Sequence, residues 1–226
     1  MENRRVPTTA VDFVRAHTRL APVPFVPELS LYLADEPIEL WERTEQGSAA
    51  EQPPPFWAFA WAGGQALARH LLDNPELVAG RRVLDLATGS GLVAIAAARA
   101  GAAGVTANDI DPLSLAAAEA NAEANAVRVA TVEGDLLETR EGYVEAGVIL
   151  AGDVFYSREM AARVLPFLRW AAGRGALVLV GDPGRAYLPT GLIERATYDV
   201  PVLEALESVP VRHTTVWQVT NGVQRG

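Results

Sequence analysis

Four aspartates lie at the ends of predicted buried strands in this chain: Asp85, Asp109, Asp135 and Asp153. The first introduces the turn Ala87-Thr88-Gly89-Ser90-Gly91. Parallel strands of an open α/β sheet end at one edge, and ligands bind in the crevice outside these ends. Carboxylates there attract a cation and repel a diphosphate, because one charge contact at about 4 Å and an effective dielectric near 20 contributes about 4 kcal/mol.

The glycine turn fits two cofactors. Gly89, Gly91 and Ala94 match the G-x-G-x-x-A pattern of dinucleotide sites, and Asp109 follows Gly89 by twenty residues. Asp85 discriminates between them, because its carboxylate would repel a pyrophosphate but attract the ammonium of S-adenosylmethionine. We therefore expect S-adenosylmethionine and methyl transfer, with an NAD-dependent oxidoreductase as the alternative. A structural alternative is that Asp85, Gly89 and Gly91 only shape the turn.

The other acids have expected roles along the same edge. Asp109 can accept hydrogen bonds from both ribose hydroxyls of either cofactor. Asp111 is expected to be the N-cap of the next helix rather than a ligand. Asp135 can accept from the adenine amine, with a solvated loop acid as the alternative. Asp153 is expected at the centre of the crevice, where the strand order reverses.

The elements that position these acids alternate between strand and helix from residue 81 onward, which is typical of a Rossmann-like, doubly wound α/β sheet. Strands are predicted at residues 82–86, 105–108, 127–132, 147–150, 176–180, 197–202 and 214–219, and helices at 92–100, 112–125 and 159–172. The last two strands can pair antiparallel at an edge. We expect a mostly parallel sheet of seven strands with an antiparallel edge strand.

The N-terminal region has a weaker pattern. We predict a helix at 9–17, a proline-spaced run at 22–27, strands at 29–33 and 38–41, a flexible linker at 47–55 and a helix at 64–72. A chain of 226 residues, half of them apolar, can bury one full core. We expect a single methyltransferase domain over residues 1–226, with residues 1–55 as a cap on a catalytic core at 56–226.

Composition argues against several classes of function. The chain has no cysteine, three scattered histidines and a formal charge of −9, which disfavours disulfides, metal sites and broad nucleic-acid contact. The longest apolar stretch, residues 92–105, is interrupted by Arg99 and is too short to span a bilayer. No export signal follows Met1, so we expect a cytoplasmic protein without metal, membrane or nucleic-acid partners.

The chain resembles the seven-strand methyltransferases, and Asp153-Val154-Phe155-Tyr156 matches the D-x-x-Y motif of protein-lysine methyltransferases among them. The blocks at residues 55–67, 108–112, 152–156 and 181–185 are similar to the electron-transfer-flavoprotein β-subunit lysine methyltransferases, and the resemblance extends over about residues 53–219. It departs at Ala87, where the usual turn has a glycine. We expect that exchange to be tolerated if φ at Ala87 is negative.

The resemblance implies S-adenosylmethionine as cofactor and a lysine-bearing protein, the flavoprotein β-subunit, as substrate. Methylation of another protein, for example a ribosomal one, or of a small amine is the alternative, as is a non-catalytic binding module. By position, the expected cofactor contacts are Trp61, Asp85, Gly89, Gly91, Asp109, Ile110, Asp135 and Leu136; the catalytic residues are Asp153 and Tyr156; the substrate contacts are Trp57, Phe59, Phe155 and Arg185.

Some of these roles have structural alternatives. Trp57, Phe59 and Trp61 alternate along the chain, so all three could face one side of an extended segment, but Trp57 and Phe59 could equally pack in the core. Ordinary packing is likewise the alternative for Phe155 and Tyr156, and a surface charge for Arg185. We expect Asp153 and the Tyr156 hydroxyl to orient the lysine ammonium and to pass its proton to water.

Overall fold

The computed structural model describes residues 9–45, 53–138, 146–203 and 208–222. A seven-stranded sheet in the order β5-β4-β3-β6-β7-β9-β8 forms its centre. The strands are β3 (Arg82–Leu86), β4 (Gly104–Asp109), β5 (Ala130–Glu133), β6 (Val148–Gly152), β7 (Leu177–Asp182), β8 (Ile193–Pro201) and β9 (Val211–Val219). Neighbours are parallel from β5 to β7, and β9 is antiparallel to both β7 and β8. The predicted sheet with its antiparallel edge is confirmed.

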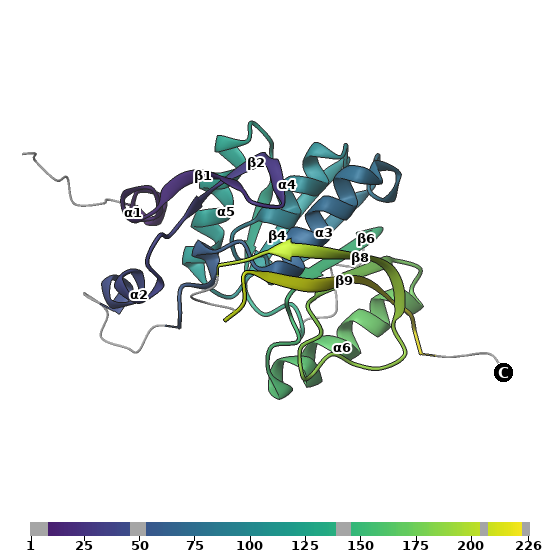
Figure 1. Cartoon of the computed structure of the whole chain (residues 1–226). Coiled ribbons are helices and arrows are strands. Elements are labelled where there is room, and N and C mark those ends of the chain that lie inside the picture. The colour runs from purple at the N-terminus through teal and green to yellow at the C-terminus, as the bar shows by residue number, and fades with distance from the viewer. Residues whose placement is uncertain (1–8, 46–52, 139–145, 204–207, 223–226) are drawn as a thin grey trace, which may run out of the picture.

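Helices cover both faces of this sheet (Figure 1). On one face lie α3 (Ala62–Asp73), α4 (Leu92–Arg99) and α5 (Pro112–Ala124), and on the other lies α6 (Arg158–Gly173). Successive residues of a strand point to opposite faces, so Val83 packs in the apolar cluster under α3 and α4 while Leu84 packs in the cluster under α6. Among the described residues, no helix is long and apolar enough to cross a membrane.

The N-terminal segment folds over the helical layer. It contains α1 (Ala10–His17), the strands β1 (Arg19–Val23) and β2 (Val26–Leu33), and α2 (Pro37–Glu45). The strands β1 and β2 pair antiparallel as a separate two-stranded hairpin, the N-terminal hairpin, which lies over α4 and α5 (Figure 1). Its fully buried Leu29 and Leu31 belong to the same apolar cluster as α3 and α4.

In this segment one sequence prediction is wrong and one strand was not predicted. Residues 38–41, predicted as a strand, belong to helix α2, where Leu40 is 2% exposed and the Glu39 carboxylate pairs with Arg43 one turn later. This i,i+4 ion pair favours the helix over an extended chain. Strand β1 was not predicted, because its C-terminal end overlaps the proline-spaced run. Pro22 is tolerated in this strand because β1 is an edge strand. The predicted linker falls largely on residues 46–52, outside the described residues.

Candidate active site

The crevice lies where β3 and β6 run side by side, because the strand order reverses between them. Asp85 belongs to β3, Asp109 ends β4, Asp153 follows β6 and Asp182 ends β7. The glycine turn, residues 87–91, connects β3 to α4 at the same edge. The topology therefore brings three of the predicted acids, Asp85, Asp109 and Asp153, to one edge of the sheet, together with Asp182, which had not been predicted there.

Asp85 braces the glycine turn from inside. Its side chain accepts hydrogen bonds from the Thr88 hydroxyl at 2.5 Å and from the Ala94 N–H at 3.0 Å, and the residue is 1% exposed. Burial raises the pKa of Asp85 to about 7, against the effect of these hydrogen bonds. Both hydrogen bonds end on Oδ2, so this oxygen shapes the turn, as the structural alternative expected. A contact of Asp85 with the cofactor stays a prediction.

Asp109 connects the end of β4 to the glycine turn. Its Oδ2 accepts from the Gly89 N–H at 3.0 Å and its Oδ1 accepts from the Asp111 N–H at 3.1 Å. Burial raises the pKa of this carboxyl, and both hydrogen bonds oppose that shift. The neighbouring Ile110 is 69% exposed, so an apolar side chain stands open beside the carboxylate.

Ala87 does not meet the condition expected from the sequence. Its φ is +53°, in the left-handed region, where an L-residue other than glycine is strained by about 1–2 kcal/mol. Gly89 and Gly91 have φ of +53° and +79° in the same turn. The turn thus contains three left-handed residues, and Ala87 is the one that lacks the freedom of glycine.

Two of the remaining acids make protein contacts. Asp111 is the N-cap of α5, as expected, because its side chain accepts from the Leu113 N–H at 2.8 Å. Asp135 accepts from the Leu137 N–H and forms an ion pair with Arg163. An adenine contact from Asp135 would therefore share that carboxylate with Arg163. Leu136, expected at the cofactor, is 3% exposed and packs in the cluster under α6.

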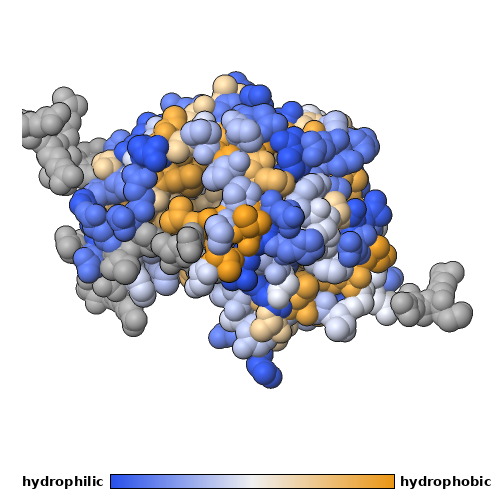
Figure 2. Space-filling model, in the orientation of Figure 1, coloured by the Kyte–Doolittle hydropathy of each residue, from blue (hydrophilic) through white to orange (hydrophobic). Residues whose placement is uncertain are grey.

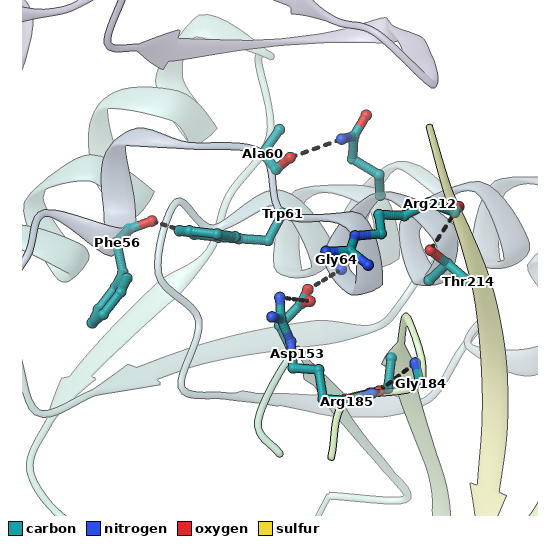
Figure 3. A network of polar contacts seen from close by, with 11 residues as sticks. Phe56, Ala60, Trp61, Gly64, Asp153, Gly184, Arg185, Arg212 and Thr214 are labelled. Carbon is teal, nitrogen blue, oxygen red and sulfur yellow. Dashed lines mark hydrogen bonds and ion pairs between the residues drawn. The ribbon is translucent and has the colours of Figure 1, made fainter. Parts of the chain in front are cut away.

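Asp153 is the centre of a polar network at the mouth of the crevice (Figure 3). Its Oδ1 accepts from the Arg185 guanidinium at 2.9 Å, and its Oδ2 accepts from the Gly64 N–H at 2.9 Å, in the first turn of α3. The Asp153 side chain is 11% exposed. Burial raises its pKa to about 6, although the Arg185 charge acts in the opposite direction. Arg185 is therefore part of the site and not a distant surface charge.

Two glycines allow the backbone to come close enough for this network. A Cβ added at Gly63 would lie 2.2 Å from the Gly181 carbonyl oxygen and 2.6 Å from Asp153 Oδ2. A Cβ at Gly181 would lie 2.0 Å from the Gly63 carbonyl oxygen. Helix α3 and strand β7 can therefore touch only through glycine at both positions, and their contact holds Asp153 in place.

Three aromatic residues border the network. The Trp61 indole N–H donates to the Phe56 carbonyl at 2.9 Å, and the Arg185 guanidinium carbon lies 6.0 Å from the centre of the Trp61 ring. The Phe56 and Tyr156 ring centres are 6.1 Å apart, and these residues are 46% and 54% exposed. Partial burial, with the Asp109 charge as a second cause, raises the pKa of the Tyr156 hydroxyl. This hydroxyl remains protonated at neutral pH and can donate a hydrogen bond.

Three predicted substrate contacts have buried side chains, although Phe59 also lines the apolar pocket described below. Trp57 and Phe59 are 1% and 6% exposed and pack with α1 and α5, while Phe155 is fully buried under α6. The alternation argument fails because residues 56–58 form a short 3-10 helix rather than a strand. That helix turns Phe56 outward, and the alternation rule had not selected Phe56.

Trp61 also lines an apolar pocket. The pocket is lined by Pro24, Leu33, Ala34, Phe59, Ala60, Trp61, Gln65, Pro201, Val202 and Leu203. Figure 2 shows apolar side chains, in orange, gathered around a hollow near the middle of the face seen there. Gln65 connects three segments at this wall, because its side chain accepts from the Phe25 N–H and donates to the Ala60 and Pro201 carbonyls. Trp61 thus borders both the pocket and the Asp153 network.

Comparisons with known proteins agree with this architecture. A family model described as ribosomal protein L11 methyltransferase (PrmA) matches residues 66–155. The electron transfer flavoprotein beta subunit lysine methyltransferase of Xenopus laevis is 37% identical over 212 residues, 91% of this chain and 85% of that protein. The protein of the same name from Danio rerio is 40% identical over 186 residues, 81% of this chain and 70% of its own length.

Solved structures show the same fold. An RNA methyltransferase from Salinibacter ruber, in complex with S-adenosyl-L-homocysteine, aligns with 71% of this chain and 95% of its own, with a TM-score of 0.50 and 21% identity. At that identity the likeness concerns the fold alone. The two curated relatives decide the family, because their similarity spans most of both chains. The chain is a methyltransferase and belongs to the electron transfer flavoprotein beta subunit lysine methyltransferase family.

Proposed function

We propose that this protein transfers a methyl group from S-adenosylmethionine to a lysine side chain of the electron transfer flavoprotein beta subunit. The observation that carries the proposal is the identity of 37–40% with relatives that bear this activity in their names, over most of both chains. The enzyme is an S-adenosylmethionine-dependent methyltransferase by family. The choice of lysine and of the protein substrate follows the relatives.

The glycine turn fits this cofactor. A Cβ at Gly89 would meet no atom of the described residues within 4 Å, so a ligand can approach the backbone there. Asp109 accepts from the backbone N–H groups of Gly89, Asp111 and Ile110, and a carboxylate has about four acceptor sites, which leaves room for a ribose hydroxyl. The exposed Ile110 offers apolar surface to a base. When bound, S-adenosylmethionine supplies an electrophilic methyl group on a sulfonium sulfur.

Asp153 is suited to orient the lysine amine. Each of its oxygens has one protein donor, and each retains capacity for another hydrogen bond. Its backbone has a φ of +56°, and its N–H donates a hydrogen bond to the Gly181 carbonyl. Together these fix the position of the Asp153 backbone and so the direction of its side chain. Tyr156 and Phe56 stand on the solvent side, where they can contact the aliphatic part of a lysine. Positioning of this kind supplies much of the rate of a displacement reaction.

The protein must also favour the neutral amine. A free lysine has a pKa of about 10.4 and is neutral once in about 2,500 molecules at pH 7, a deficit of about 4.6 kcal/mol. Arg185 offsets the charge of Asp153 and places a cation near the amine, and both effects lower the lysine pKa. The aromatic residues Trp61, Phe56 and Tyr156 exclude water from the amine and act in the same direction.

The substrate can be tested directly with purified proteins. We expect the enzyme and S-adenosylmethionine to increase the intact mass of the flavoprotein beta subunit in steps of one methyl group, and to leave ribosomal protein L11 unchanged. Peptide mapping then locates the modified lysine. Methylation of L11 alone would transfer the proposal to the substrate named by the family model. If neither protein is methylated, the proposed substrate is wrong.

The role of Asp153 is tested by Asp153→Asn. We expect affinity for S-adenosylhomocysteine to stay within severalfold of wild type, because Asp153 is not placed at the glycine turn, while methyl transfer collapses. Isothermal titration measures the first quantity and intact mass against time the second. Asp199→Asn is the control, since Asp199 is an exposed acid on β8 that pairs with His213. Unchanged turnover in Asp153→Asn would remove Asp153 from this role.

A further inference from the structure

Two asparagines of α5 hold the backbone of the N-terminal hairpin. Asn121 Oδ1 accepts from the Tyr32 N–H at 2.7 Å. Asn125 accepts from the Ser30 N–H at 3.0 Å and donates to the Ser30 carbonyl at 2.6 Å. The asparagines are one helical turn apart and so lie on one face of α5, where they satisfy the edge of β2 as a neighbouring strand would.

Asn121 also reaches the glycine turn. Its Nδ2 donates to the Ser90 carbonyl at 2.8 Å, and the residue is fully buried. The Nδ2 of Asn125 instead donates to the Ser30 and Asn121 carbonyls. Of these two asparagines, only Asn121 joins the hairpin to the turn. One amide thus bonds Tyr32 with its oxygen and Ser90 with its nitrogen.

The turn depends on outside contacts for its shape. Ser90 lies between Gly89 and Gly91, whose φ values of +53° and +79° belong to residues with little conformational preference of their own. The bond to Asn121 fixes the direction of the Ser90 carbonyl, and because a peptide group is planar it also fixes the N–H of Gly91, which donates to the Thr88 carbonyl at 3.0 Å. A rotated peptide would lose both hydrogen bonds.

The hairpin in turn keeps Asn121 in position. A buried amide with both ends bonded has one rotamer that satisfies it, and the Tyr32 N–H selects that rotamer. The packing of Leu29 and Leu31 against the α3–α4 side of the core anchors β2, so this donor does not move freely. Figure 1 shows the hairpin lying across α5, above the layer that carries the turn.

We propose that Asn121 is a positioning residue through which the N-terminal hairpin holds the glycine turn in its cofactor-binding shape. The hairpin is thus part of the cofactor site without touching the cofactor. This rests on the proposed use of S-adenosylmethionine, and it assigns to the N-terminal segment a role in shaping the cofactor site.

The experiment compares Asn121→Ala with Asn125→Ala in the full chain. Both variants lose a buried hydrogen-bonding side chain to the hairpin, and both are expected to lower the melting temperature. Only Asn121→Ala loses the contact to Ser90. We expect it to weaken binding of S-adenosylhomocysteine about tenfold in isothermal titration, with Asn125→Ala within twofold of wild type. For turnover, we expect the KM for S-adenosylmethionine to rise while the KM for the protein substrate stays constant.

A second measurement protects the test against misfolding. The melting temperature of each variant is recorded, and binding is compared at a temperature well below every transition. Equal affinity of wild type and Asn121→Ala overturns the proposal, as does an equal loss in Asn125→Ala. If wild type itself does not bind S-adenosylhomocysteine, the cofactor assignment fails first and this inference fails with it. If wild type binds S-adenosylhomocysteine tightly, the cofactor assignment stands and only the role of Asn121 is being tested.

Discussion

Gly63 and Gly64 are adjacent in α3, yet the structure predicts opposite responses to alanine. In Gly63→Ala the new Cβ would lie 2.2 Å from the Gly181 carbonyl oxygen, so α3 and β7 must move apart by about an ångström. In Gly64→Ala it would lie 3.9 Å from Leu92 and Val93 side-chain atoms, an ordinary contact distance. The two substitutions add the same methyl group to the same helix, and only its surroundings differ.

The magnitudes follow from general values. Overpacking against backbone costs about 1–3 kcal/mol, and alanine in place of helical glycine gains up to about 1 kcal/mol. At about 2–4 °C per kcal/mol for a protein of this size, we expect overpacking in Gly63→Ala to lower the melting temperature by roughly 2–12 °C, and the helical gain to offset at most about 4 °C of this. Gly64→Ala should leave it unchanged or raise it by up to about 4 °C.

The assay is thermal unfolding followed by circular dichroism, with methyl transfer measured below the transition. Gly63→Ala should also reduce turnover while the protein is still folded, because its Cβ would lie 2.6 Å from Asp153 Oδ2 and displace that carboxylate. Melting temperatures that shift together in the two variants would refute the reasoning. A fully active Gly63→Ala would show that Asp153 need not stay where the structure places it.

Two further predictions concern the glycine turn. Ala87→Gly should stabilise the protein by about 1 kcal/mol in urea unfolding, because it relieves left-handed strain at φ +53°, whereas Ala100→Gly, at φ −79°, should destabilise it; a loss in both would contradict the strain argument. Burial raises the Asp85 pKa to about 7, so the folded state retains a proton that the unfolded state loses near pH 4, and the unfolding free energy should fall as pH rises from about 4 to about 7. In Asp85→Asn the unfolding free energy should fall less over this pH range, by up to about 4 kcal/mol. The measurement is urea unfolding between about pH 4 and about pH 7, and the same pH dependence in variant and wild type would exclude Asp85 as the cause.

The strand and helix order of the sheet could be predicted because it depends on local pattern. Buried parallel strands such as residues 82–86 read as short apolar runs, and the predicted bounds match β3. The N-cap at Asp111 was equally local, since a capping side chain bonds within three residues. The prediction of a strand at residues 38–41 was wrong because a short amphipathic run fits both the helical and the strand periodicity. The burial of Leu40 in the folded protein favours the helix.

The directions of the side chains in the site could not be predicted from local sequence pattern. That aspartates follow the strands was visible in the chain, but the direction of each carboxylate was not. Asp85 turns inward to Thr88 and Ala94, and Asp153 faces Arg185, which lies 32 residues away in the chain. Phe56 was missed and Trp57 chosen because alternation assumes an extended segment, which the 3-10 helix replaces.

The order of amino acids alone therefore determined the doubly wound sheet, the glycine turn and the edge at which the acids gather, since patterns within a few residues indicate each of them. Only the tertiary structure decided which side chains meet there. The Gly63–Gly181 contact, the Asp153–Arg185 pair and the Asn121 bonds to Tyr32 and Ser90 join distant segments. Their geometry depends on how helices and sheet pack in three dimensions, which no local period encodes.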